Sequence, residues 1–269
     1  MNNKFQTILL KAKEDVYTHL SGGNISRILG QGYDFYELRE YESSDDIRHI
    51  SWINSAKLGQ PYVKKMHEER ELNVAVCSLI DGRFSVGKKR ELLAYVVALL
   101  GYSAYEANDL FTAFTFVGDE LKSYEATKNL YSIEKVIEDI ANGELLGKKI
   151  DYGKIDTMAM ESKHLLFVVG DFLDPVDLSV LAQKHEVVVI IIRDELEENP
   201  PVSINEQLVN PQNNQLINQT LDKKSIEHYR AKLLEHDERL FYHFTEHAIK
   251  YIKVFNEEAF LWKLEKLWV

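Results

Sequence analysis

Three apolar segments of the chain run into an aspartate, and carboxylates so placed could hold a metal or perform acid–base chemistry. Asp81, Asp171 and Asp194 follow the apolar segments 72–80, 164–170 and 186–192. If the first segment is a central strand of a doubly wound sheet, Asp81 and Asp171 end neighbouring strands, ~4.8 Å apart. Two carboxylates at that distance repel each other unless a cation lies between them. The sequence therefore raises the question of which cation that is.

A structural role for these acids stays open beside the functional one. The residues that follow Asp81 and Asp171 are predicted to lead into helices, and helix N-termini favour carboxylates. A single aspartate in such a position is best explained as a helix cap. Two aspartates at the predicted switch point of a sheet are equally well explained as a candidate site.

The apolar segments alternate with helical patterns, which predicts an α/β fold with a doubly wound, mostly parallel sheet. The predicted strands are 72–80, 111–117, 164–170, 186–192 and 251–255, with 120–126 as a hairpin partner of the second. The predicted helices are 5–20, 91–108, 133–142 capped by Ser132, one starting at Asp174-Pro175, 224–239 and 256–267. The polar segment 202–219 is expected to be a hairpin or a loop.

Two domains are expected. Residues 1–70 form an N-terminal helix and a strand-rich extension, in which aromatic and charged residues mix with poor periodicity. We expect this extension to pack on the main domain, 71–269, which ends in a helical tail. The chain shows no internal repeat.

Composition narrows the function classes. The 269 residues are 45% hydrophobic and 28% charged, which is ordinary for a globular protein. The net charge of −11 argues against a nucleic-acid partner, because binding phosphates needs clustered cations. Cys77 is the only cysteine, so no disulfide can form within the chain. No apolar stretch reaches the ~18–20 residues of a membrane span, and we expect a cytoplasmic protein.

Two acidic loops and an upstream block resemble a known family. The segment Asp-Gly-Arg-Phe-Ser at 81–85 is similar to the D-x-S-x-S loop of von Willebrand factor type A domains, and Gly170-Asp171-Phe172 resembles their second acidic loop. Residues 32–41 (G-x-D-F-x-x-L-R-x-Y) and 45–56 (D-D-I-R-x-I-x-W-x-x-S-A) are more distinctive. Together these features resemble the bacterial domain-of-unknown-function family 58 (DUF58), over roughly residues 30–230.

This resemblance implies a von Willebrand A-like, Rossmann-type sheet and a protein-binding role. Similar domains are partners of MoxR-type AAA+ ATPases and act in assembling or activating other proteins. We therefore expect an adaptor without enzymatic activity. The alternatives are a Mg²⁺-dependent adhesion-type site that binds an acidic residue of its target and, less favoured, a metal-dependent hydrolase.

The first acidic loop departs from the family pattern at the position of its first serine. In von Willebrand A domains a divalent ion is held by the Asp and two Ser of this loop, a Thr of a middle loop and the later Asp. This chain keeps Asp81, Ser85 and Asp171, has Arg83 in place of the first Ser, and offers no matching Thr. We expect the Arg83 guanidinium to supply the positive charge of the metal, so that no cofactor is needed. An Arg83 that points into solvent, with Mg²⁺ in the loop, is the alternative.

The upstream block has two interpretations of its own. Its charged and aromatic residues could form a buried polar network that ties the extension to the sheet, or a surface that faces a partner. The residues concerned are Arg39, Asp45, Asp46, Arg48 and Trp52. We favour the network.

Two catalytic motifs are matched only in part. His243-x-x-Glu246-His247 matches the H-x-x-E-H pattern of inverted zinc peptidases, but the sequence offers no third ligand. Aspartyl-phosphate chemistry of the haloacid type needs a second Asp two residues after Asp81, where Arg83 stands. No glycine-rich phosphate loop is present either.

Overall fold

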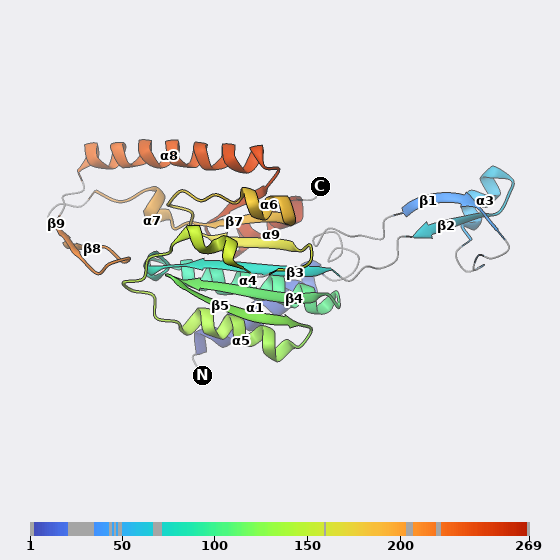
Figure 1. Cartoon of the computed structure of the whole chain (residues 1–269), viewed down its shortest axis with the longest axis horizontal. Helices are drawn as coiled ribbons and strands as arrows, with labels where there is room; N and C mark the ends of the chain where they lie inside the picture. The colour runs from blue at the N-terminus through green and yellow to red at the C-terminus, as the bar shows by residue number, and fades with distance from the viewer. Residues whose placement is uncertain are drawn as a thin grey trace.

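A six-stranded sheet forms the centre of the molecule in the computed structural model, which describes residues 3–20, 35–42, 45, 47, 50–66, 72–158, 160–202, 207–218 and 222–267. Its strand order is β10-β7-β6-β3-β4-β5 (Figure 1). The strands are β3 (Asn73–Ile80), β4 (Leu110–Val117), β5 (Glu120–Thr127), β6 (Leu165–Gly170), β7 (Glu186–Ile192) and β10 (Lys250–Val254). All neighbours are parallel except β5, which returns antiparallel to β4 in the predicted hairpin. The predicted strands and the central place of β3 are confirmed.

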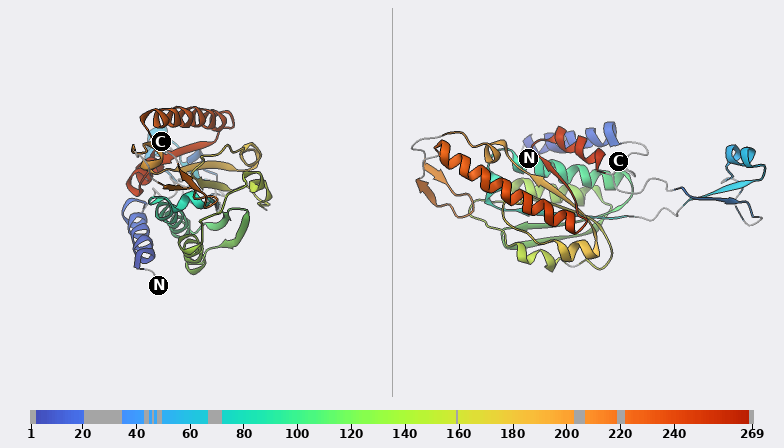
Figure 2. Two further views of the ribbon diagram at one scale, coloured as in Figure 1. Left: turned by 90° about the vertical axis from the view of Figure 1, so that its left-hand side faces the viewer. Right: turned by 90° about the horizontal axis from the view of Figure 1, so that it is seen from above.

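Helices cover both faces of this sheet, which confirms the doubly wound α/β class. One face packs against α1 (Asn3–Asp15), α4 (Lys89–Glu106), α5 (Leu130–Asn142) and α9 (Glu257–Lys266). The other face packs against a 3₁₀ turn (Tyr152–Thr157), α6 (Ser179–Lys184) and α8 (Lys223–Glu246). Figure 2 shows α8 and α1 on opposite sides of the sheet. Because α4 lies between the sheet and the outer helices, it is buried continuously from Leu92 to Ala104.

Three predicted helix boundaries were wrong. Ser132 does not cap α5: the helix begins at Leu130, because the Asn129 side chain accepts from the amides of Tyr131 and Ser132. No helix starts at Asp174-Pro175; α6 begins only at Ser179. The α8 helix does not end at residue 239 but continues to Glu246.

The N-terminal part contains two separate pieces of structure. The predicted helix 5–20 is present as α1 followed by a π-helical turn (Val16–Leu20), and its apolar stripe packs on α4. The strands β1 (Phe35–Glu40) and β2 (Tyr62–Met66) form an antiparallel hairpin that carries α3 (Trp52–Leu58). Figures 1 and 2 draw this hairpin unit apart from the six-stranded sheet. The division into domains 1–70 and 71–269 stays a prediction.

Two small elements lie beside the ends of the central strands. The polar segment contains the hairpin of β8 (Gln207–Val209) and β9 (Leu216–Asn218), as expected. A short helix, α7 (Glu195–Glu198), follows β7 and was not predicted. Both lie on the same side of the sheet as the carboxyl ends of the strands (Figure 1), and both contribute side chains to the candidate site.

Candidate functional site

Asp81 and Asp171 lie together at the carboxyl ends of two neighbouring strands. Asp81 follows β3, Asp171 follows β6, and these strands pair in parallel. Both aspartates are buried, with 2% and 1% of their surface exposed. Asp81 also caps a 3₁₀ turn (Gly82–Ser85), so the capping role and the site role coexist in this residue. For Asp194 only the structural role is observed: its side chain caps α7 in a capping box.

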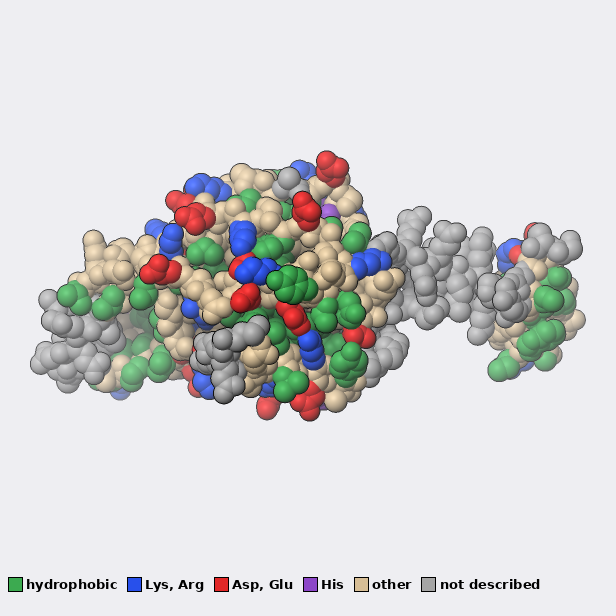
Figure 3. All heavy atoms as spheres, turned by 90° about the horizontal axis from the view of Figure 1, so that it is seen from below, with side chains coloured by type: hydrophobic (Ala, Val, Ile, Leu, Met, Phe, Trp, Pro, Cys, Tyr) green, Lys and Arg blue, Asp and Glu red, His purple; other side chains and the backbone are tan. Residues whose placement is uncertain are grey.

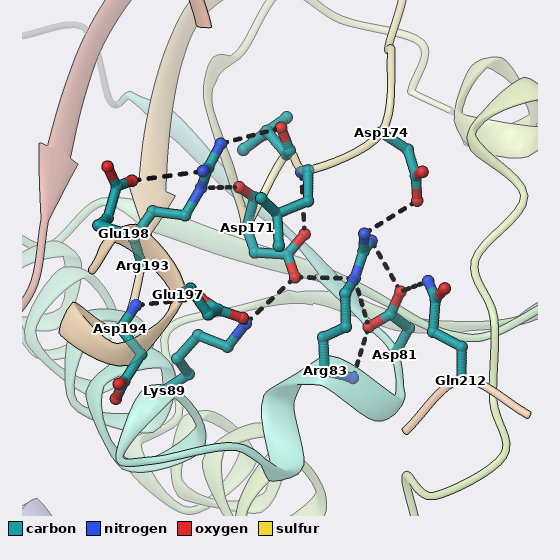
Figure 4. A network of polar contacts seen from close by, with 12 residues as sticks. Asp81, Arg83, Lys89, Asp171, Asp174, Arg193, Asp194, Glu197, Glu198 and Gln212 are labelled. Carbon is teal, nitrogen blue, oxygen red and sulfur yellow. Dashed lines mark hydrogen bonds and ion pairs between the residues drawn. The ribbon is translucent and has the colours of Figure 1, made fainter. Parts of the chain in front are cut away.

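The Arg83 guanidinium lies between these two carboxylates (Figure 4). Its Nη2 is 2.8 Å from Asp81 Oδ2, and its Nε is 3.0 Å from Asp171 Oδ2. Its Nη1 is 3.0 Å from the Oδ2 atom of a third carboxylate, Asp174. Only 12% of the Arg83 side chain is exposed, so it does not point into solvent. The arginine stands where the sequence suggested that a cation is needed.

Burial and the neighbouring charges set the protonation states of Arg83 and Tyr152. Burial alone would lower the pKa of Arg83, but the charges of Asp171 and Asp81 outweigh burial and raise its pKa above the ordinary value. Arg83 Nη2 also donates to the hydroxyl of Tyr152 at 3.4 Å. Burial, together with the charge of Asp171, raises the pKa of Tyr152 as well. Arg83 is thus a permanent cation and Tyr152 a neutral phenol at physiological pH.

A second buried cation, Lys89, binds the same acid. Its Nζ is 3.3 Å from Asp171 Oδ2 and also pairs with Glu197 of α7. The Lys89 side chain is 1% exposed. Lys89 was not among the predicted site residues, although the sequence carries a signal for it: a lysine in the first turn of an apolar helix opposes the helix dipole and needs a compensating acid.

Arg193 supports the second acidic loop from behind. Its side chain is fully buried and donates to the carbonyl oxygens of Asp171 at 2.6 Å and Phe172 at 3.2 Å. It also pairs with Asp237 of α8 at 2.9 Å. Phe172 adopts a left-handed conformation with φ of 48°, which is uncommon for a residue with a side chain. Arg193 therefore holds the loop in the shape that presents Asp171 to Arg83.

The turn between β8 and β9 closes the site from a distant part of the chain. Gln212 Nε2 donates to Asp81 Oδ2 at 2.7 Å, across 131 residues of sequence. The backbone of this turn lies against Gly82, where an added Cβ would come within 1.8 Å of the Pro211 carbonyl oxygen. No local pattern predicts a contact of this kind.

We expect Gly82→Ala to separate this turn from the acidic loop. Two backbone segments meet at Gly82, so the methyl group cannot be accommodated by a side-chain rotation. The free energy of unfolding should fall by about 1–3 kcal/mol, the usual cost of overpacking. Urea denaturation measures this change. Gly143→Ala is the control, because a Cβ atom added there would lie 3.2 Å from its nearest neighbour, the Asp139 carbonyl oxygen. An equal loss of stability in both variants would contradict the expectation.

The donor set present here does not fit a divalent ion. Arg83 occupies the space between the carboxylates, and Ser85, the expected second ligand, is exposed to solvent. Among the residues that the structure describes, no group of three or more His, Cys, Asp or Glu could hold a metal ion. His243 Nε2 instead accepts from the Leu178 amide at 3.2 Å, and its ring lies 4.7 Å from that of His247. A zinc site at this histidine pair is therefore not supported.

The upstream block is only partly described. Arg39 pairs with Asp45 at 2.5 Å, whereas Asp46 and Arg48 lie outside the described residues. Trp52 is 70% exposed and does not cover a buried network as the favoured interpretation required. The described residues of the block make no contact with Arg83 or its acids, so the two predicted groups of site residues are not brought together.

These features define a class: a doubly wound α/β domain with a buried, ion-paired charge cluster at the carboxyl ends of its two central strands. A family model described as "Protein of unknown function DUF58" matches residues 37–239, and the chain belongs to this family. None of the described helices is long and apolar enough to cross a membrane.

Several known proteins are similar to this chain. Uncharacterized protein Mb1516 of Mycobacterium bovis and Uncharacterized protein Rv1480 of Mycobacterium tuberculosis are each 24% identical over 202 residues. The match spans 70% of this chain and 64% of theirs, just under two thirds of their length.

Two solved structures are also similar. The conserved hypothetical protein BatB from Bacteroides thetaiotaomicron has a TM-score of 0.43 and 15% identity, covering 73% of this chain and 96% of its own. An aerotolerance-related membrane protein from Bacteroides fragilis has a TM-score of 0.42 and 13% identity, covering 73% and 98%.

Proposed function

We propose that this protein is a non-enzymatic, protein-binding adaptor of the cytoplasm, with a MoxR-type AAA+ ATPase as its partner. The observation that carries the proposal is the complete pairing of the two central carboxylates. The identity of the partner rests on the resemblance to domains that work with such ATPases.

Every carboxylate oxygen of the central pair has a protein partner. Asp81 Oδ1 accepts from the amide and Nε of Arg83, and Asp81 Oδ2 contacts Arg83 Nη2 and Gln212. Asp171 Oδ1 accepts from the Leu173 amide at 3.3 Å, and its Oδ2 contacts Arg83 and Lys89. A general base or a metal ligand needs free lone pairs directed at its target. Carboxylates whose oxygens are already occupied by protein groups suit recognition better than catalysis.

The hairpin unit adds a surface that suits docking. Ile47, Trp52, Ile53 and Leu58 are each more than half exposed, and α3 buries none of its residues. Figure 3 shows hydrophobic side chains gathered on this unit. Contiguous exposed apolar side chains of this kind mark interaction sites. They favour the partner-facing interpretation of the upstream block.

The experiment is a binding titration with a purified MoxR-type ATPase from the same organism. We expect Trp52→Ser to weaken binding by about tenfold or more, as loss of an exposed tryptophan anchor does. Its free energy of unfolding should change by less than about 0.5 kcal/mol, because the side chain is exposed. Tyr242→Ser removes an equally exposed aromatic ring from α8 and serves as the control.

Two results would count against this proposal. Equal binding by wild type and Trp52→Ser would remove the hairpin unit from the interface. Hydrolysis of a phosphoester or peptide substrate that Asp81→Asn abolishes would favour the metal-dependent hydrolase instead.

A further inference from the structure

A groove lies between α7 and the first half of α8, beside the charge cluster. Its cavity volume is about 410 Å³, within the range of ligand-binding pockets. Leu196 and Pro200 line it on the α7 side, and Ile226 and Tyr229 line it on the α8 side. A groove of this size has room for a few side chains and not for a folded domain.

The charge at this groove that has no ion-pair partner among the described residues is positive. Glu197 is the acid in its wall, and it is turned inward to pair with Lys89. Lys232 and His228 also line the groove, and both side chains are exposed. Neither makes an ion pair with any residue that the structure describes. Although the chain as a whole carries a net charge of −11, the unpaired lysine favours an anionic group at this opening.

The groove is continuous with the charge cluster through one side chain. Glu197 belongs to the groove wall, and its partner Lys89 also binds Asp171, which binds Arg83 (Figure 4). The charge of Glu197, after burial, also contributes to a raised pKa of Tyr229 in the opposite wall. Any change in the pairing of Glu197 alters the potential in the groove.

We propose that the α7–α8 groove binds an acidic peptide segment of a protein partner, with an apolar side chain between Leu196 and Ile226 and a carboxylate on Lys232. This inference rests on the proposed function, since the segment belongs to the protein that the adaptor binds. The apolar walls supply affinity, and the lysine selects a carboxylate over a cationic group.

Three fluorescein-labelled nine-residue peptides test the inference by fluorescence anisotropy. The first alternates leucine and glutamate, the second replaces each glutamate by lysine, and the third replaces each leucine by serine. We expect the first to bind at least about tenfold more tightly than either of the others, about 1.4 kcal/mol. Preference for the lysine peptide, or equal binding of all three, would overturn the inference.

Variants locate the binding in the groove. Lys232→Glu should lower the affinity for the acidic peptide by about tenfold or more, because a carboxylate of the protein then repels the carboxylates of the peptide. Lys163→Glu makes the same charge change at an exposed position before β6 and should leave the affinity unchanged. Lys89→Met should also lower the affinity for the acidic peptide, because it leaves the negative charge of Glu197 uncompensated beside the groove. Equal effects of Lys232→Glu and Lys163→Glu would contradict binding in the groove.

The two proposals fail in distinguishable ways. If the ATPase binds through Trp52 and the acidic peptide does not bind, the groove is wrong and the adaptor stands. If the peptide binds through Lys232 and the ATPase does not bind, the partner is wrong and the groove stands.

Discussion

Arg83→Ser is expected to lower the free energy of unfolding by about 3–5 kcal/mol in metal-free buffer. The substitution removes the cation between Asp81 and Asp171, which are almost fully buried and would face each other without it. Breaking a buried ion pair by removing one partner typically costs this much. Urea denaturation in the presence of a chelator measures the loss. The control is Arg39→Ser, whose partly exposed pair with Asp45 should contribute no more than about 1 kcal/mol.

The same variant should acquire affinity for Mg²⁺, because serine restores the D-x-S-x-S pattern at 81–85. Carboxylate and hydroxyl oxygens are ligands that Mg²⁺ prefers. Lys89 stays 3.3 Å from Asp171 and opposes a second cation, so Arg83→Ser combined with Lys89→Met should bind Mg²⁺ more tightly. Calorimetric titration checks this order. Tight Mg²⁺ binding by the wild type, lost in Asp81→Ala, would show instead that Arg83 does not replace a metal.

Local sequence pattern was sufficient for the sheet and for half of the site. Apolar runs of strand length identified β3, β6 and β7, and parallel pairing then required Asp81 and Asp171 to meet. Arg83 lies two residues after Asp81 on a tight turn, so its proximity to the first acid also follows from local geometry.

The remainder of the site depends on contacts that no local pattern encodes. Lys89, Arg193 and Gln212 reach the loops from three separate elements, and their partners lie 22 to 131 residues away. The helix predicted to start at Asp174-Pro175 was wrong for the same reason. The Leu178 amide, just before α6, donates to His243 of the distant helix α8, and no local pattern encodes this contact.

The upstream block shows the opposite failure. Interleaved charges and aromatics suggested an interdigitated seam, but the described hairpin unit contains only two strands and a seven-residue helix. Such a unit has no second layer within the described residues to cover Trp52 and Ile53, which are 70% and 74% exposed. A two-stranded hairpin is marginally stable alone, so further packing against a partner would stabilise it.

Arg193→Met is expected to lower the free energy of unfolding by about 3–5 kcal/mol, although Arg193 touches neither Arg83 nor the carboxylate of Asp171. Methionine fills a similar volume but leaves the carbonyl oxygen of Asp171 without its donor and removes one of the two cations that pair with Asp237. Buried acceptors and charges left unpaired are among the few causes of losses this large.

Arg193→Lys separates a requirement for geometry from a requirement for charge. One ammonium group cannot reach two carbonyl oxygens and the Asp237 carboxylate with the fixed spacing of a guanidinium, so lysine should recover less than half of the loss. Arg239→Met removes an arginine whose side chain is 73% exposed and should change stability by less than about 1 kcal/mol. Urea denaturation of the three variants decides the matter. Full recovery by lysine would mean that positive charge alone holds the second acidic loop in place, and that the left-handed turn at Phe172 does not depend on the two carbonyl contacts.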